Sequence, residues 1–216
     1  MTEDLVQKHF HKKADDFDSI YTGQKSGIAR LLDKWFRWDM EKRFQRTIEE
    51  CGDVSGKTII DVGCGSGRFM EVLQGKNPSL ILGLDFVPNM LIIARKILSE
   101  QMADNPCELA TGDFNRMEFR KPFDITLAIG LFDYIAEPLQ MLKKMRHVTR
   151  EKLIATFPRA GTLRSAIRKV RLSLYKCPVY FFKPEQVRSM MEEAGFTDIQ
   201  LEAFGQLIFA TGKPFL

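Results

Sequence analysis

Apolar positions predict strands alternating with helices from about residue 50 onward. Short apolar runs rich in β-branched residues indicate buried strands, and segments with apolar residues at helical spacing lie between them. The strand candidates are residues 58–62, 79–84, 107–111, 123–132 including the strand exit, 152–157, 197–204 and 206–211. The helix candidates are residues 69–73, 90–102, 139–148 and 183–195. Strands and helices in this order are typical of a parallel α/β sheet.

The composition is that of one globular domain. With 216 residues, 44% of them hydrophobic and 28% charged, the chain is long enough for one complete core and short for two. No stretch approaches about 18 consecutive apolar residues, so no transmembrane helix is expected. The first residues lack the basic start and apolar run of a signal peptide. The four cysteines and three histidines lack metal-site spacing, and scattered thiols favour a cytoplasmic protein without a metal.

A glycine-rich turn joins the first predicted strand to a helix within residues 58–69. Three glycines follow Asp61 at alternate positions. Glycine lets a backbone adopt positive φ and approach a ligand closely, and the next helix offers free N–H groups to an anion. The dinucleotide fingerprint G-x-G-x-x-G fails, because its third glycine would fall on Arg68 or Met70. A P-loop lysine is also missing, and a glycine turn without a ligand is the alternative.

This Asp-x-Gly-x-Gly-x-Gly segment resembles the first motif of class I S-adenosylmethionine-dependent methyltransferases. In that family the glycine loop lies against the amino-acid end of the cofactor, and the acidic residue orients the loop and meets the cofactor's ammonium group. The resemblance places these roles on Asp61, Gly63, Gly65 and Gly67. The cofactor that it implies is S-adenosyl-L-methionine.

Two further acidic residues follow predicted strands, where the family has its second and third motifs. The resemblance implies that Asp85 accepts hydrogen bonds from the ribose hydroxyls; a cap on the next helix is the alternative. It implies that Asp113 accepts from the adenine amine, although Gly-Asp is also common in turns. The other implied cofactor contacts are Phe86 and Met90 flanking the adenine, Phe114 packed on its ring, Ile129 in the fourth motif, and Tyr21 near the cofactor.

The exit of the fourth strand resembles the family's fourth motif, which faces the transferred methyl group. It lacks the Asn/Asp-Pro-Pro-Tyr/Phe of enzymes that methylate amines of bases, and the chain lacks the paired cysteines that attack C5 of pyrimidines. Both absences argue against these two nucleic-acid chemistries. Asp133 and Tyr134 follow this strand and are the catalytic candidates, although a carboxylate acceptor needs no general base.

Residues 1–50 contain no strand candidate and carry apolar residues at helical spacing, among them Trp38, Phe44 and Ile48. Basic and acidic residues lie between them. One interpretation is a helix that packs on the sheet and keeps a solvated face. The other, implied by the resemblance to small-molecule methyltransferases, is a lid over the substrate pocket.

Residues 159–176 hold six basic residues and no acidic one, in a chain whose net charge is only +4. A solvated basic helix is one interpretation. A roof over the pocket that attracts an acidic substrate, through Arg164 and Arg168, is the second. The third is attachment to an anionic membrane or nucleic acid.

The resemblance covers roughly residues 50–214 and implies a Rossmann-like seven-stranded sheet of order 3-2-1-4-5-7-6, with strand 7 antiparallel and helices on both faces. It divides the chain into a helical lid or extension over residues 1–50 and a methyltransferase domain over 51–216, with a cap insertion at about 159–180. The layout is loosely similar to the magnesium-protoporphyrin O-methyltransferase group.

The expected activity is methyl transfer, with O-methylation favoured, to a small acidic or aromatic metabolite. One alternative is a catalytically inactive, methyltransferase-like binding module, and another is an RNA or protein methyltransferase that uses the basic segment. The expected partner is the small-molecule substrate. Nucleic acid is disfavoured, peripheral membrane contact stays open, and a monomer or homodimer is expected.

Overall fold

Strands and helices alternate along the computed structural model, which describes residues 29–99, 106–162 and 179–215. The strands are β1 (Thr58–Val62), β2 (Leu80–Asp85), β3 (Cys107–Thr111), β4 (Phe123–Ala128), β5 (Thr149–Pro158), β6 (Phe196–Phe204) and β7 (Leu207–Pro214). The helices are α2 (Ala29–Cys51), α3 (Arg68–Leu73), the 3-10 helix η1 (Gln74–Lys76), α4 (Pro88–Ser99), α5 (Pro138–Val148) and α7 (Pro184–Glu193).

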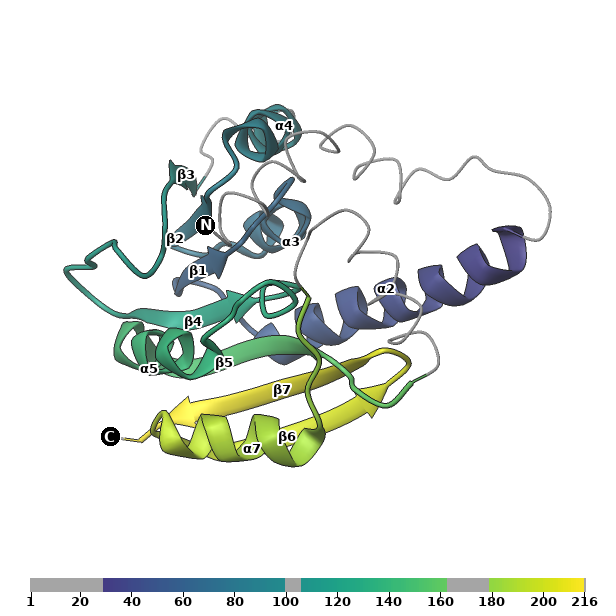
Figure 1. Ribbon diagram of the computed structural model, residues 1–216. Coiled ribbons are helices and arrows are strands. Elements are labelled where there is room, and N and C mark those ends of the chain that lie inside the picture. Colours follow the sequence, from purple (N-terminus) through teal and green to yellow (C-terminus); the bar gives the residue numbers. More distant parts are fainter. Residues whose placement is uncertain (1–28, 100–105, 163–178, 216) are drawn as a thin grey trace.

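The strands form one sheet with the order β3-β2-β1-β4-β5-β7-β6 (Figure 1). β1 to β5 are parallel, and β7 is antiparallel to both of its neighbours, β5 and β6. This arrangement confirms the Rossmann-like sheet that the family resemblance implied. The carboxyl ends of the parallel strands meet at one edge, where ligands bind in open α/β sheets.

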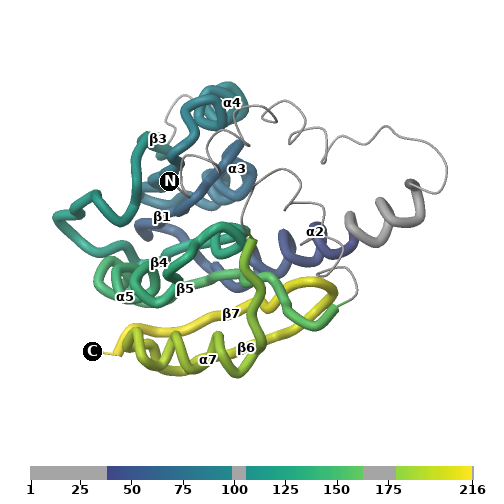
Figure 2. The backbone as a smooth tube through the Cα atoms, viewed as in Figure 1, coloured from purple at the N-terminus to yellow at the C-terminus, as the bar shows by residue number. Residues whose placement is uncertain are grey.

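Helices cover both faces of the sheet, with α2, α3 and α4 on one face and α5 and α7 on the other (Figure 2). Neighbouring strand residues point to opposite faces, and β1 shows this in its core contacts. Ile59 lies in the cluster that contains Phe69 and Leu73 of α3. Ile60 lies in the cluster that contains Leu142 of α5. The sheet is therefore buried on both sides, as its near-continuous apolar strands predict.

β5 begins at Thr149, directly after α5 ends, whereas the apolar pattern predicted a start at residue 152. The Thr149 hydroxyl donates to the Met145 carbonyl at 2.6 Å and lies 2.7 Å from the Thr126 hydroxyl, so helix end and strand start are joined. Arg150 and Glu151 are exposed in this first part of the strand. Their polarity explains why an apolar pattern did not include them.

α2 lies within the segment predicted to be helical and docks against the turn between β6 and β7; residues 1–28 lie outside the described residues. Gly205 has a φ of 50°, and the Asp39 carboxylate occupies the space that a side chain at Gly205 would need. Lys42 Nζ lies 4.2 Å from the ring centre of Phe204 and 2.8 Å from Glu202 Oε1. These contacts fix α2 relative to the sheet.

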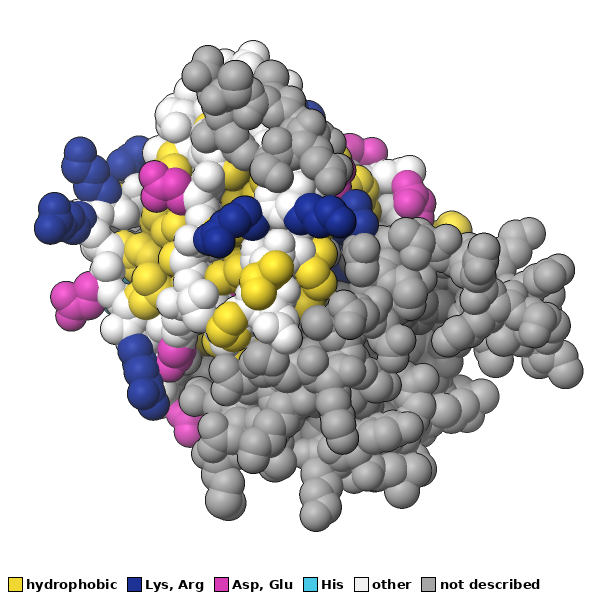
Figure 3. Space-filling model, turned by 90° about the horizontal axis from the view of Figure 1, so that it is seen from above, with side chains coloured by type: hydrophobic (Ala, Val, Ile, Leu, Met, Phe, Trp, Pro, Cys, Tyr) yellow, Lys and Arg dark blue, Asp and Glu magenta, His cyan; other side chains and the backbone are white. Residues whose placement is uncertain are grey.

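Figure 3 shows the molecule from above, relative to the view of Figure 1. On this surface Lys and Arg side chains are interspersed with hydrophobic ones. α4 contributes to the mixed character of the surface, since Ile92 is 64% exposed and Arg95 is also exposed. Among the helices that lie in the described ranges, none has both the length and the apolar character needed to cross a membrane.

Candidate active site

The glycine turn between β1 and α3 has the conformation for which glycine is needed. Gly63, Gly65 and Gly67 have φ angles of 77°, 55° and 77°, a region that other residues rarely adopt. Space is also limited, because a Cβ at Gly63 would lie 3.1 Å from Leu131 Cδ1 and one at Gly65 would lie 3.4 Å from Met90 Cε. The turn therefore packs between the exit of β4 and the start of α4, with its backbone close to the strand ends.

Asp61 is a buried acid in β1 that carries an unsatisfied oxygen. The residue is 1% exposed, and its Oδ2 atom is fully buried without a hydrogen-bond partner. Burial first, and then the charge of Asp85, raise the pKa of Asp61 to about 7. A buried carboxylate without a partner is costly, whereas one that meets a cation is stabilised. The site is thus suited to a cationic group such as an ammonium.

Asp85, at the end of β2, holds the glycine turn in place. Its Oδ2 accepts from the Gly65 N–H at 2.9 Å and its Oδ1 accepts from the Val87 N–H at 2.8 Å. Burial raises the pKa of Asp85, against the backbone hydrogen bonds that lower it. The bond to Val87 N–H spans two residues and closes an Asx turn directly before α4, so within the described hydrogen bonds Asp85 shapes the entry to this helix. Each carboxylate oxygen can accept a second hydrogen bond, so ribose hydroxyls can also be bound.

The predicted adenine pocket lies beyond β3, and the turn there has polar contacts of its own. Asp113 Oδ1 accepts from the Asn115 N–H at 2.9 Å, and Asp113 Oδ2 lies 3.2 Å from Arg116 Nε. Phe114 is 4% exposed and belongs to the core cluster, with Lys144 Nζ 5.4 Å from its ring centre. The turn chemistry that the sequence left as an alternative for Asp113 is therefore present. The adenine roles of both residues stay predictions.

Two of the predicted adenine neighbours lie at the start of α4. Met90 is 3% exposed and packs with Val87, and the partly exposed Phe86 lies against the same pair. Because Met90 also faces the glycine turn, this small apolar cluster borders the region between Asp85 and the turn.

The exit of β4 brings the two catalytic candidates to the same edge of the sheet. The Asp133 carbonyl accepts from the Tyr180 N–H at 3.0 Å, and the Tyr134 N–H donates to the Leu131 carbonyl at 3.1 Å. Both residues are partly buried. Ile129, just before this exit, is 8% exposed and packs in the cluster beneath α2 and α3. The remaining predicted site residues, Tyr21, Arg164 and Arg168, lie outside the described residues.

Arg43 of α2 also reaches this edge. From the sequence alone it was only one of several basic residues in a predicted helix. Its Nη1 atom lies 3.3 Å from the position of a Cβ at Gly130, the residue after Ile129. The contact joins residues 87 positions apart in the chain. No local spacing could have predicted it.

The residues at this edge fit S-adenosylmethionine. The buried Asp61 oxygen suits its ammonium group, the glycine turn allows close approach of the backbone, and Asp85 keeps acceptor capacity for hydroxyl groups. Within residues 29–99, 106–162 and 179–215, no group of His, Cys, Asp and Glu is arranged to hold a metal ion.

A known protein family matches most of the chain. The family described as "Methyltransferase domain" matches residues 53–195, which is most of the chain. The chain belongs to the class I S-adenosylmethionine-dependent methyltransferases. This methyltransferase therefore uses S-adenosylmethionine as its methyl donor.

A solved structure supports the same fold over nearly the whole length. Magnesium protoporphyrin IX methyltransferase from Synechocystis PCC 6803 with bound SAH superposes with a TM-score of 0.76 at 17% identity, covering 98% of this chain and 99% of that one. At this identity the likeness shows the fold alone.

Two curated relatives are tRNA U34 carboxymethyltransferases. The tRNA U34 carboxymethyltransferase of Photobacterium profundum is 22% identical over 205 residues, covering 85% of this chain and 63% of the relative. That of Haemophilus influenzae is 23% identical over 172 residues, covering 76% of this chain and 52% of the relative. The methyltransferase thus spans about half to two thirds of the length of these two relatives.

Proposed function

We propose that this methyltransferase O-methylates a small acidic or aromatic metabolite at the carboxyl edge of its sheet. The observation that carries the proposal is the packing of the β4 exit on the glycine turn, through Leu131 and Gly63. Asp133 and Tyr134 follow Leu131 closely in the chain, at a strand exit without the proline pair of amine-methylating enzymes. A small oxygen acceptor suits such a site better than an extruded base.

The proposal assigns the cofactor to the residues that the family resemblance implied. Asp61 and the turn glycines hold the amino-acid end, Asp85 holds the ribose, and Asp113 accepts from the adenine amine. S-adenosylmethionine supplies a methyl group that its sulfonium sulfur already activates. The flanking contacts in this assignment are Phe86, Met90, Phe114, Ile129 and Tyr21.

The protein's own contribution is then alignment and exclusion of water. Holding an acceptor in a near-attack position can supply about 7–11 kcal/mol of the barrier. In the proposal the Asp133 carboxylate takes the proton of a phenol or alcohol acceptor while the Tyr134 hydroxyl orients it, and a carboxylate acceptor needs neither step. Backbone hydrogen bonds at the β4 exit, from Tyr180 N–H to the Asp133 carbonyl and from Tyr134 N–H to the Leu131 carbonyl, hold the segment that carries these two residues.

The proposed organisation is a helical lid or extension over residues 1–50 and a methyltransferase domain over 51–216, with a cap at about 159–180. Arg164 and Arg168 of the cap would attract the acidic substrate. A cytoplasmic location, which the free thiols of Cys51 and Cys64 support, and a monomer or homodimer complete the proposal.

A second candidate function is RNA modification, and the names of the curated relatives favour it. The basic segment 159–176 would then contact phosphates instead of a small acid. Binding of this kind weakens steeply with salt, whereas a small-acid substrate depends on salt less strongly because it has fewer charges.

Incubation of the enzyme with S-adenosylmethionine separates the two. One reaction receives a panel of small aromatic acids and phenols and another receives bulk tRNA, and mass spectrometry follows methyl gain. A third reaction gives bulk tRNA a sulfonium donor that carries a carboxymethyl group, and mass spectrometry follows gain of that group. The proposal expects a methylated small acid. Modification of tRNA alone, with activity that falls steeply as salt rises, would contradict it and favour the RNA enzyme.

A further inference from the structure

Arg43 differs from the two basic residues beside it on α2. Lys42 Nζ lies 2.8 Å from Glu202, and Arg46 pairs with Glu50 at 2.6 Å and with Glu202 at 3.1 Å. Within residues 29–99, 106–162 and 179–215, by contrast, no acidic side chain pairs with Arg43. Of the three basic residues of α2 from position 42 onward, Arg43 is therefore the one that has no acidic partner among the described residues.

The guanidinium of Arg43 is also partly removed from water. Its Nε atom is fully buried and has no hydrogen-bond partner, and the residue as a whole is partly buried. A long basic side chain that only covers apolar surface keeps its charged head in water. Arg43 does not follow this pattern, because its Nε–H is buried. A buried donor without an acceptor costs free energy.

The position of the guanidinium relates it to the active site. Nη1 lies beside Gly130, which has a φ of 77° and whose N–H donates to Thr156 Oγ1 at 2.8 Å. The next residue, Leu131, packs on Gly63 of the cofactor turn. Arg43 thus reaches the β4 exit from the α2 side, at the residue directly before the one that contacts the turn.

We propose that the Arg43 guanidinium binds an oxyanion of the methyl acceptor, a carboxylate or a phosphate. The planar guanidinium presents paired N–H donors that match the two oxygens of such a group. An acceptor oxyanion bound at the Nη atoms would neutralise the unpaired charge of the guanidinium. The inference rests on the proposed function and narrows it to anionic acceptors.

Arg43 has a binding role in this proposal and takes no part in proton transfer, because a guanidinium stays protonated in proteins. It is distinct from Arg164 and Arg168, which lie in another segment of the chain. Gly130 gives the guanidinium room, since a side chain there would push against Nη1.

Calorimetric titration of acetate and of inorganic phosphate into the enzyme saturated with S-adenosylhomocysteine tests the proposal. The two anions distinguish a carboxylate site from a phosphate site. At least one is expected to bind the wild type, and Arg43→Met should weaken that anion by about 10-fold or more, the loss of a charged hydrogen bond. Arg43→Lys, which keeps the charge and loses the planar fork, should lie between them.

Lys42→Met is the matched control, because it removes the same charge from the neighbouring position where Glu202 already pairs with it. Its anion affinity should stay within about twofold of wild type, and Arg43→Met should keep its S-adenosylhomocysteine affinity and its thermal unfolding. The proposal would be overturned if Arg43→Met and the wild type bound the anion with equal affinity. It would also be overturned if the wild type bound neither acetate nor phosphate at the highest concentration at which the protein stays in solution. Anion binding that depends on Arg43, in an enzyme that methylates no small acid, would contradict the proposed function and leave the anion site standing.

Discussion

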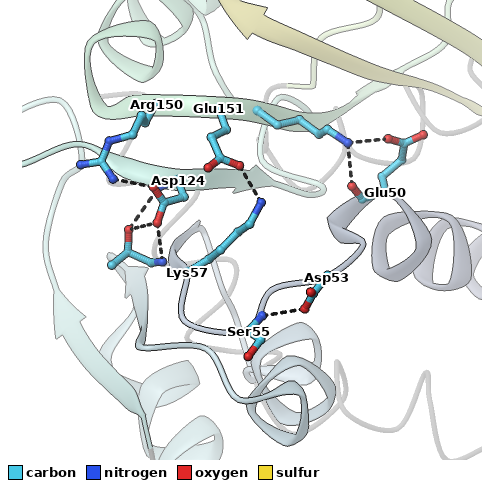
Figure 4. A network of polar contacts seen from close by, with 9 residues as sticks. Glu50, Asp53, Ser55, Lys57, Asp124, Arg150 and Glu151 are labelled. Atoms are coloured by element: carbon cyan, nitrogen blue, oxygen red, sulfur yellow. Dashed lines mark hydrogen bonds and ion pairs between the residues drawn. The ribbon is translucent and has the colours of Figure 1, made fainter.

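The edge of the sheet where the parallel strands begin (the amino edge) and the edge where they end (the carboxyl edge) differ in whether their charged groups are paired. At the amino edge, Asp124 accepts hydrogen bonds from the Thr58 N–H at 2.8 Å and from Arg150 Nη1 at 2.5 Å (Figure 4). Lys57 there lies 2.6 Å from Glu151. At the carboxyl edge, Asp61 has a buried oxygen without a partner. The first edge is internally satisfied and the second is not.

A surface hollow near the amino edge makes the same contrast. Its volume is about 390 Å³, and its charged lining includes Glu50, Lys152, Asp198 and Lys213. These charges are already paired, Lys152 with Glu50 at 3.2 Å and Lys213 with Asp198 at 2.9 Å. A hollow of this kind needs no ligand to balance its charge. Unsatisfied charge, rather than hollow shape, therefore marks the functional edge of this sheet.

Neutralising the carboxyl edge should have the largest effect on cofactor binding. Asp61→Asn keeps the shape of the side chain and removes the charge that would meet the ammonium group. We expect S-adenosylhomocysteine to bind about 10- to 100-fold more weakly by calorimetry, the equivalent of one charged hydrogen bond. The ligand-free variant should unfold at the same or a higher temperature at pH 8. An unchanged affinity would remove Asp61 from the site.

Asp85→Ala should weaken S-adenosylhomocysteine by at least about 10-fold, because it removes hydrogen bonds to a charged acceptor. The loss has two sources, the proposed ribose contact and the bonds to the Gly65 and Val87 N–H groups. Asp85→Asn serves as the comparison, since its amide oxygen can still accept one of these bonds. Calorimetry that finds wild-type affinity in Asp85→Ala would refute the ribose assignment.

The matched change at the amino edge should affect stability and leave binding alone. Asp124→Asn removes the charge that pairs with Arg150, and we expect a loss of about 1–3 kcal/mol in the free energy of unfolding. Denaturant titration measures that loss. The affinity for S-adenosylhomocysteine should stay within about twofold of wild type. A large loss of affinity here would show that the two edges are not functionally separate.

The smallest effect concerns the pH dependence of stability, where the two aspartates should act with opposite signs. Hydrogen bonds from Thr58 and Arg150 outweigh burial and lower the pKa of Asp124, so its stabilisation is present at neutral pH and is lost as pH falls through the folded pKa. Asp61 has a raised pKa of about 7, so the folded protein keeps a proton that the unfolded chain has lost. Between about pH 4 and 7 its contribution to stability therefore decreases as pH rises.

Denaturant titrations of the ligand-free protein across this pH range check both signs. Asp61→Asn should make stability fall less between pH 4 and 7, and Asp124→Asn should make it fall less on acidification below pH 4. The same pH dependence in Asp61→Asn and wild type would mean that Asp61 is not the buried acid that titrates in this range.

Periodicity alone predicted most of the elements, and the family motifs predicted their order in the sheet. The β3 bounds, Cys107–Thr111, agree with the prediction. α4 begins at Pro88, two residues before the predicted start at residue 90, because proline is favoured in the first turn of a helix. The helix predicted over residues 183–195 is observed as α7, which ends at Glu193 with Ala194 as its C-cap, and Gly195 follows directly with a φ of 90°. These features are local, so short stretches of sequence determine them.

The features that the sequence could not predict depend on tertiary contacts. Trp38 was placed in the apolar stripe of α2 but is 52% exposed, because six residues at about 100° each turn it away from the face of Phe44. Phe44 itself stacks on Phe69 of α3, with ring centres 5.1 Å apart. Arg43 was one basic residue among several until the fold placed it beside Gly130. No spacing rule relates these positions.

We propose that Asp61 Oδ2, which has no hydrogen-bond partner in the protein, receives the ammonium group of the cofactor. The most direct test is the number of protons released when S-adenosylhomocysteine binds, measured calorimetrically at pH 6 in buffers with different ionisation enthalpies. A carboxyl group with a pKa of about 7 is mostly protonated at that pH and must ionise to pair with an ammonium. We expect a clear release of protons by the wild type and close to none by Asp61→Asn. Equal proton release by both proteins, or none by the wild type, would contradict it.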